Sequence, residues 1–79
     1  MMGKEEFLIE FASLLAREPG GLTGDEALDE LEGWDSLAVV SFMGFADERF
    51  GITLSAKEIE SYVKINDLFD MVTKKVPVS

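Results

Sequence analysis

Ser36 is the residue of this sequence whose position best suits chemistry. It follows Gly33, Trp34 and Asp35 and precedes Leu37, where a loop is expected to pass into a helix. A serine in the first turn of a helix exposes its hydroxyl to a second protein, and the positive end of the helix dipole stabilises an anionic group attached there. Gly33 lets the chain turn tightly into that helix. The chain contains no cysteine, so thioester chemistry would need a thiol supplied by an added group.

The same serine could instead be a catalytic nucleophile, because Gly-x-Asp-Ser-Leu is similar to the Gly-Asp-Ser-Leu motif of some serine esterases. A Ser-His-Asp triad needs a histidine, and the chain has none. Its 79 residues are also too few for the sheet of a hydrolase. We therefore exclude this class, and we predict that the protein has no catalytic residues and is not an enzyme by itself.

Apolar residues at helical spacing predict the elements that position this serine. The first helix is predicted from Glu5 to Arg17 and is ended by Pro19-Gly20-Gly21. The second is predicted from Ser36 to Phe50. Asp35 suits its N-cap, and Gly51 suits the left-handed position just past its end.

Two more helices complete the prediction. Ser55 and Glu58 form a capping-box pattern ahead of a short third helix, and the last helix runs from Ile65 or Asn66 to Lys75. The long connection from Leu22 to Asp35 is acidic and has room for one helical turn between Asp25 and Leu31. The sequence therefore predicts an all-α fold, a small four-helix bundle in one domain of residues 1–79.

Charge is the clearest global property of the chain. Sixteen acidic residues against seven basic ones give a net charge of −9, which repels nucleic acids and anionic lipids and favours proteins with basic patches. The acids of the long loop do not follow the ligand pattern of a calcium-binding loop, so we expect no metal site. Without an apolar run long enough to span a membrane or a signal-peptide pattern, we expect a cytoplasmic monomer that does not insert into membranes.

The segment Gly33-Trp34-Asp35-Ser36-Leu37 resembles the attachment motif of acyl carrier proteins, in which a glycine and a variable residue precede Asp-Ser-Leu. The resemblance covers nearly the whole chain, with a long loop before the motif and the remaining helices in the family's order. It implies that a magnesium-dependent phosphopantetheinyl transferase moves 4′-phosphopantetheine from coenzyme A onto Ser36. It also implies that Asp35 caps the helix and helps organise the metal in that complex, and that Leu37 contacts the transferase and later partners.

The resemblance further implies a carrier that shuttles acyl thioesters between enzymes of fatty-acid, polyketide or specialised lipid metabolism. Its partners would be a loading ligase and downstream synthases or transferases. An aminoacyl or peptidyl carrier and an unmodified acidic interaction module stay open as alternatives. In fatty-acid carriers an apolar space shelters the acyl chain, and the matching positions here are Phe42, Ala46, Ile52, Leu54, Ile59 and Tyr62. Bulky side chains in this set predict a small space and a short or exposed cargo.

The second helix is predicted to have two faces. The core face consists of Val39, Val40, Met43, Ala46 and Phe50, with Phe42 at its edge. The partner-binding surface consists of Leu37, Ala38, Ser41, Gly44, Phe45, Asp47 and Glu48. Carriers of primary fatty-acid synthesis usually make this surface acidic, whereas negative charge here is confined to its last two residues. We therefore predict a partly apolar docking surface for a dedicated set of partners.

Two aromatic residues keep two interpretations each. Phe45 is either exposed on the docking surface or folded against the first loop as part of the core. Trp34 either packs the loop against the helices or lies beside the prosthetic arm.

Overall fold

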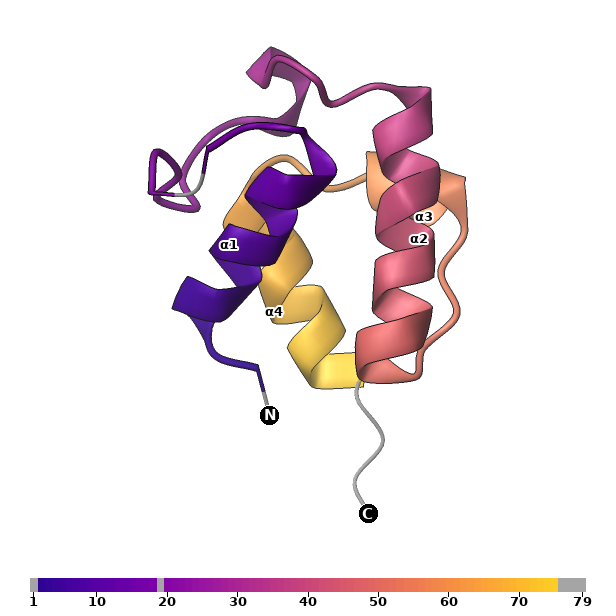
Figure 1. Cartoon of the computed structure of the whole chain (residues 1–79). Coiled ribbons are helices and arrows are strands. Elements are labelled where there is room, and N and C mark those ends of the chain that lie inside the picture. Colours follow the sequence, from indigo (N-terminus) through magenta and orange to yellow (C-terminus); the bar gives the residue numbers. More distant parts are fainter. Residues whose placement is uncertain (1, 19, 76–79) are drawn as a thin grey trace.

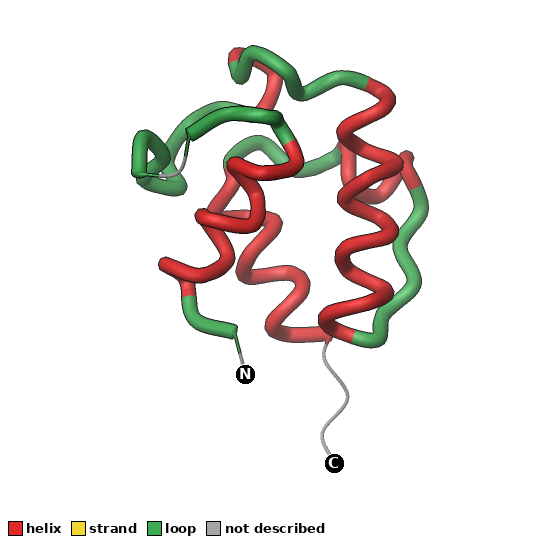
Figure 2. Tube along the Cα trace, viewed as in Figure 1, coloured by secondary structure: helices red, strands yellow, loops and turns green. Residues whose placement is uncertain are grey.

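The computed structural model describes residues 2–18 and 20–75, and these form the predicted helical bundle (Figure 1). The helices are α1 (Lys4–Leu14), α2 (Ser36–Phe50), α3 (Ala56–Glu60) and α4 (Ile65–Lys75), with a short 3₁₀ helix, η1 (Leu28–Glu30), between α1 and α2. Figure 2 shows helices joined by loops, without a strand in the described ranges. Among these residues no helix is long and apolar enough to span a membrane.

Helix α1 is shorter than predicted: it ends at Leu14 and not at Arg17. Ala16 adopts the left-handed conformation with φ of 55°, and its N–H bonds to Ser13 O while the Arg17 N–H bonds to Ala12 O. These two bonds form a Schellman motif, which usually has glycine in the left-handed position. An alanine there carries no sequence signal for the helix end. Pro19 lies outside the described residues.

Helix α2 has the predicted bounds and both predicted end signals. The Asp35 carboxylate accepts a hydrogen bond from the Ala38 N–H at 3.0 Å, and Gly51 takes the left-handed conformation with φ of 68°. In α3, the Ser55 hydroxyl accepts from the Glu58 N–H at 3.1 Å. The Glu58 carboxylate pairs with Lys75 at 2.8 Å, which links α3 to the end of α4.

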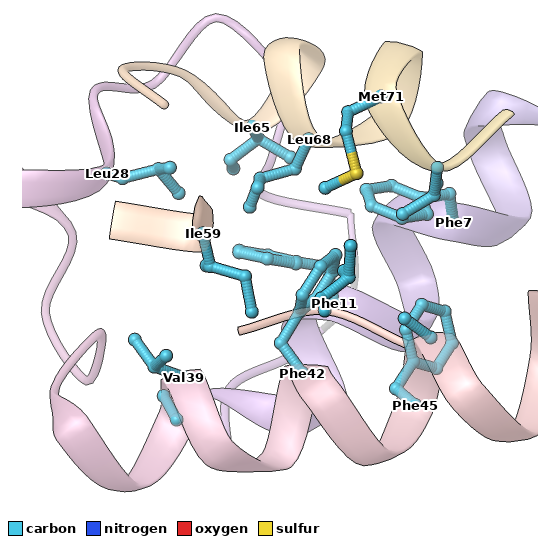
Figure 3. Close-up of a cluster of buried hydrophobic side chains, with 14 of the residues drawn as sticks. Phe7, Phe11, Leu28, Val39, Phe42, Phe45, Ile59, Ile65, Leu68 and Met71 are labelled. Atoms are coloured by element: carbon cyan, nitrogen blue, oxygen red, sulfur yellow. The ribbon is translucent and has the colours of Figure 1, made fainter. Parts of the chain in front are cut away.

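The core is built around aromatic side chains of α1 and α2, against which Ile65, Leu68 and Met71 of α4 pack (Figure 3). Phe7 and Phe11 of α1 and Phe42 of α2 are fully buried, and the rings of Phe7 and Phe42 meet edge to face with centroids 6.1 Å apart. Phe69 of α4 approaches Phe7 at 5.1 Å. Such edge contacts suit the ring quadrupoles, so this cluster fixes the position of α2.

The buried face of α2 is rotated toward α1 relative to the prediction. Its members are Ala38, Val39, Phe42, Phe45, Ala46 and Phe50. Val40, predicted as core, is 59% exposed, and Met43 is only half-buried. The prediction placed the apolar face from α2 alone, whereas α2 contacts α1, α3 and α4. Rings from α1 draw the buried face toward Phe45.

Candidate functional site

Ser36 is the first residue of α2, and its side chain lies at the surface. The backbone N–H groups of Ser36 and Leu37 precede the first intrahelical hydrogen bond, which runs from Val39 N to Asp35 O at 3.0 Å. A helix start of this kind offers unpaired donors and a positive dipole end to an anionic substituent. The side chain of Asp35 is turned onto the Ala38 N–H and holds the first turn in place.

The chain reaches Ser36 through a bend at Gly33 and a ring at Trp34. Gly33 has φ of +93°, and a Cβ there would lie 3.3 Å from the Leu15 carbonyl oxygen at the end of α1. The position therefore favours glycine for both conformation and space. Trp34 packs on Phe11 and Phe42, with ring centroids 5.3 and 6.2 Å away. These contacts attach the residues before Ser36 to the core.

An open pocket of about 360 Å³ lies beside Ser36. It is lined by residues of the acidic loop, of the start of α2 and of the end of α3: Leu28, Asp29, Trp34, Asp35, Ser36, Val39, Glu60 and Tyr62. Trp34 thus packs the loop against the helices, as one interpretation expected, and also forms one wall of this pocket. Asp29 and Glu60 give the pocket a negative rim that the sequence did not indicate, because they come from distant segments.

The positions matched to the acyl-chain space of fatty-acid carriers lie together between α2 and α3. Phe42, Ala46 and Ile59 are fully buried there, and Ile52 and Leu54 are nearly so. Tyr62 is half-buried and forms part of the pocket beside Ser36. The bulky side chains of Phe42 and Ile59 are thus part of the packed core.

The first part of the acidic loop is tied to α4. The Glu26 carboxylate accepts hydrogen bonds from the N–H groups of Thr23 and Gly24 at 2.9 and 2.8 Å. Asn66 donates from its backbone to Gly24 O at 2.8 Å and from its side chain to Asp25 at 3.0 Å. Burial raises the pKa of Glu26 and is the largest single influence, but the backbone hydrogen bonds together outweigh it and lower the pKa below its usual 4.5. The helical turn expected in this loop is η1.

The predicted docking surface is only partly exposed. Leu37 is 75% exposed, and Ser41, Gly44, Asp47 and Glu48 also lie at the surface. Ala38 and Phe45 are buried, so placing these two side chains at the surface was wrong. Phe45 is core, as its second interpretation expected, but its ring meets Phe7 of α1 at 5.9 Å and not the first loop. Exposed Val40, one turn from Leu37, joins this surface and was missed because it was assigned to the core.

Comparison with known proteins identifies the family of this chain. The chain belongs to the phosphopantetheine attachment site family, whose model matches residues 5–72. The match includes all four helices apart from the first residue of α1 and the last turn of α4. Neither curated proteins nor solved structures gave a match. Membership makes the protein a carrier of the acyl carrier protein type, which is not an enzyme and bears a covalently attached 4′-phosphopantetheine.

The start of α2 fits that prosthetic group. A surface hydroxyl, unpaired backbone N–H groups and an adjacent open pocket occur together at Ser36. When bound, the group supplies the terminal thiol that the chain itself lacks. The family also implies interaction with a phosphopantetheinyl transferase and with enzymes that load and use the carrier.

Proposed function

We propose that Ser36 is the attachment residue and that the protein carries acyl intermediates as thioesters between enzymes. The observation that carries the assignment is the position of Ser36 at the exposed start of the longest helix, on the rim of the pocket. Ser55 also lies at a helix start, but its hydroxyl is used as a cap for the Glu58 N–H. Ser41 is also exposed, but it lies in the interior of α2, away from any free backbone donors.

Each residue of the motif has a distinct part in this proposal. Gly33 and Trp34 fix the loop against α1 and the core, so the approach to the serine keeps one shape. Asp35 holds the first turn through the Ala38 N–H. Ser36 presents its hydroxyl to the transferase, and the N-terminal end of α2 stabilises the negative charge of the resulting phosphodiester. Leu37, largely exposed, gives the transferase an apolar contact beside the reacting oxygen.

We propose a short or solvent-exposed acyl cargo. The side chains between α2 and α3 fill the region where fatty-acid carriers shelter a long chain, and the hollow beside Ser36 is open to solvent. A long chain would have to separate buried rings such as Phe42 from their neighbours, which costs the packing energy of the core.

An aminoacyl cargo is a second candidate that one observation favours. Asp29 and Glu60 line the pocket beside the serine from two different elements. Their carboxylates would attract an ammonium group and repel a cargo with a free carboxylate. Loading assays with matched butyryl and aminobutyryl thioesters would separate the two candidates.

Intact mass spectrometry tests the attachment site. We expect the wild-type chain to gain one phosphopantetheine when incubated with coenzyme A, magnesium and a promiscuous transferase. Ser36→Ala should gain nothing, whereas Ser41→Ala, an exposed serine on the same helix, should gain the group as the wild type does. The proposal would be contradicted if Ser36→Ala gained the group. It would also be contradicted if the wild type gained nothing under conditions that modify another carrier.

A further inference from the structure

The pocket beside Ser36 has room for more than a phosphate group. Its volume of about 360 Å³ lies within the range of about 300–1,000 Å³ that is typical of small-molecule sites. Two nearly buried side chains, Leu28 and Val39, and two half-buried rings, Trp34 and Tyr62, supply its apolar lining. The pocket is therefore an apolar hollow that begins at the serine and is formed by the acidic loop, the start of α2 and the chain around the end of α3.

The Trp34 ring is held in place by the core but is not covered by it. Its centroid lies 5.3 Å from the ring of Phe11 and 6.2 Å from the ring of Phe42. The side chain is nevertheless only half-buried, and it lines the pocket. A ring that is already fixed by packing loses little conformational freedom when a ligand lies against it. Trp34 is therefore a preformed surface for an apolar group attached at Ser36.

Three polar side chains of the pocket have no partner among residues 2–18 and 20–75. The side-chain hydrogen bonds and ion pairs of these residues do not involve Asp29, Glu60 or Tyr62. In contrast, the Asp35 carboxylate in the same pocket already accepts from the Ala38 N–H. The pocket thus offers two carboxylates as acceptors and one phenol hydroxyl as a donor.

We propose that this pocket binds the pantetheine arm itself and that Trp34 is the residue that positions the arm. Between its phosphate and its thiol the arm is neutral, and it contains a dimethyl carbon, a hydroxyl group and two amides. The dimethyl segment, which follows the phosphate directly, packs against Trp34. The hydroxyl and amide N–H groups donate to Asp29 and Glu60, and the Tyr62 hydroxyl donates to an amide carbonyl. A neutral ligand with several donors suits a pocket whose carboxylates would repel an anion.

This inference rests on the attachment proposed for Ser36 and adds where the attached group lies. A bound arm fills the space beside the serine, so the thiol and its cargo are left at the mouth of the pocket. This arrangement agrees with a short or solvent-exposed cargo. Each carboxylate has several acceptor sites, so the ammonium group of an aminoacyl cargo could still pair with Asp29 or Glu60.

Fluorescence and NMR of the apo and holo forms test the proposal, because Trp34 is the only tryptophan of the chain. Acrylamide should quench Trp34 less in the holo form. Amide shifts should change at Leu28, Glu60 and Tyr62 as well as around Ser36, and nuclear Overhauser contacts should join the indole protons to the dimethyl protons of the arm. Intact mass shows separately whether the arm is attached. A chain that gains no arm would contradict the proposed function, whereas a modified chain whose shift changes stay within residues 35–38 would overturn this inference alone.

Variants of the exposed carboxylates test the contacts without disturbing the core. Asp29→Ala and Glu60→Ala should each weaken binding of the arm about two- to tenfold, the contribution of one hydrogen bond, and so reduce the shift changes at Tyr62. Glu30→Ala is the matched control, because Glu30 is exposed beside Asp29 but does not line the pocket. Trp34→Phe keeps a ring against Phe11 and should also reduce these shift changes. Equal quenching of Trp34 in the apo and holo forms, or wild-type shift changes in both carboxylate variants, would overturn the proposal.

Discussion

The loop between α1 and α2 has two halves that are held in different ways. Residues 23–28 are joined to α4 and the residues before it by backbone hydrogen bonds, including Leu28 N to Val63 O at 2.7 Å and Ile65 N to Glu26 O at 3.3 Å. In the described part of the chain, the hydrogen bonds of residues 29–35 stay within the loop or reach only the first turn of α2. This second half is attached to the core through the side chains of Leu31 and Trp34.

The difference assigns separate tasks to the two halves. The first half sets the position of the loop through polar contacts between distant segments, which are lost together when the loop detaches. Among the described residues the second half has no hydrogen bonds to α1, α3 or α4, and its shape before Ser36 depends on Gly33 and on the packing of Trp34. Changes in the first half should therefore act on stability, and changes in the second half should act on modification of the serine.

Two glycines provide the strongest test of this comparison. Gly24 has φ of +101°, and a Cβ there would lie 2.2 Å from Asn66 Oδ1. Gly24→Ala should destabilise the fold by about 2–3 kcal/mol, through backbone strain and loss of the Asn66 contact. Gly33→Ala, with φ of +93° and a milder 3.3 Å approach to Leu15 O, should cost about 1–2 kcal/mol. Urea denaturation measures both values.

Modification kinetics then separate the roles of the two glycines. The folded fraction of Gly24→Ala should be modified by the transferase at the wild-type rate, whereas Gly33→Ala should be modified more slowly. Gly20→Ala is the control, because Gly20 has the same φ of +101° but open space around it. A larger stability loss at Gly33 than at Gly24 would break the comparison.

Asp35 tests the second half with a smaller expected effect. Asp35→Ala removes the acceptor for the Ala38 N–H and should destabilise the fold by about 1 kcal/mol. Asp35→Asn keeps a capping oxygen and should restore most of that stability. If the carboxylate also helps organise magnesium in the transferase complex, Asp35→Asn should still be modified slowly. Full rates for the asparagine variant would show that Asp35 acts only as a cap.

The sequence predicted those features that depend on local residue types. Asp35 and Gly51 marked both ends of α2 correctly, because side-chain capping and the left-handed glycine are local interactions. The end of α1 was missed because Ala16 occupies a left-handed position that normally requires glycine. No local pattern distinguishes such an alanine from a helical one.

Features made by several elements could not be predicted from one helix at a time. Val40 is exposed although it was expected in the core, and Phe45, left open between surface and core, is buried, because the rings of α1 pack against one side of α2. Asp29 and Glu60 line one pocket although a full helix separates them in sequence. The ties from Asn66 to the loop likewise depend on the packing of α4, which the spacing of apolar residues does not specify.

Acid pH tests the first half of the loop, residues 23–28, with the smallest expected effect. Glu26 has a folded-state pKa below its usual 4.5. Burial, the largest single influence, raises this pKa, but the hydrogen bonds, including those from the N–H groups of Thr23 and Gly24, together lower it by more. The folded state is therefore stabilised above pH 4.5, and this contribution is lost as the pH falls through the lower folded pKa. Glu26 is only half-buried, so solvent screening should keep the effect below about 1 kcal/mol.

Comparison with Glu26→Gln isolates this contribution. The amide keeps the size of the side chain, but its neutral oxygen accepts hydrogen bonds from the two N–H groups less strongly than the carboxylate does. The wild type should have the higher urea midpoint at pH 7, and the gap should close as the pH falls through the lowered folded-state pKa of Glu26 and its side chain becomes neutral like the amide. General acid effects on the other carboxylates are common to both proteins and cancel in the difference. A difference in urea midpoint that stays constant from pH 7 to pH 3 would mean that the charge of Glu26 does not hold the loop. The first half of the loop would then depend on Asn66 and the backbone contacts alone.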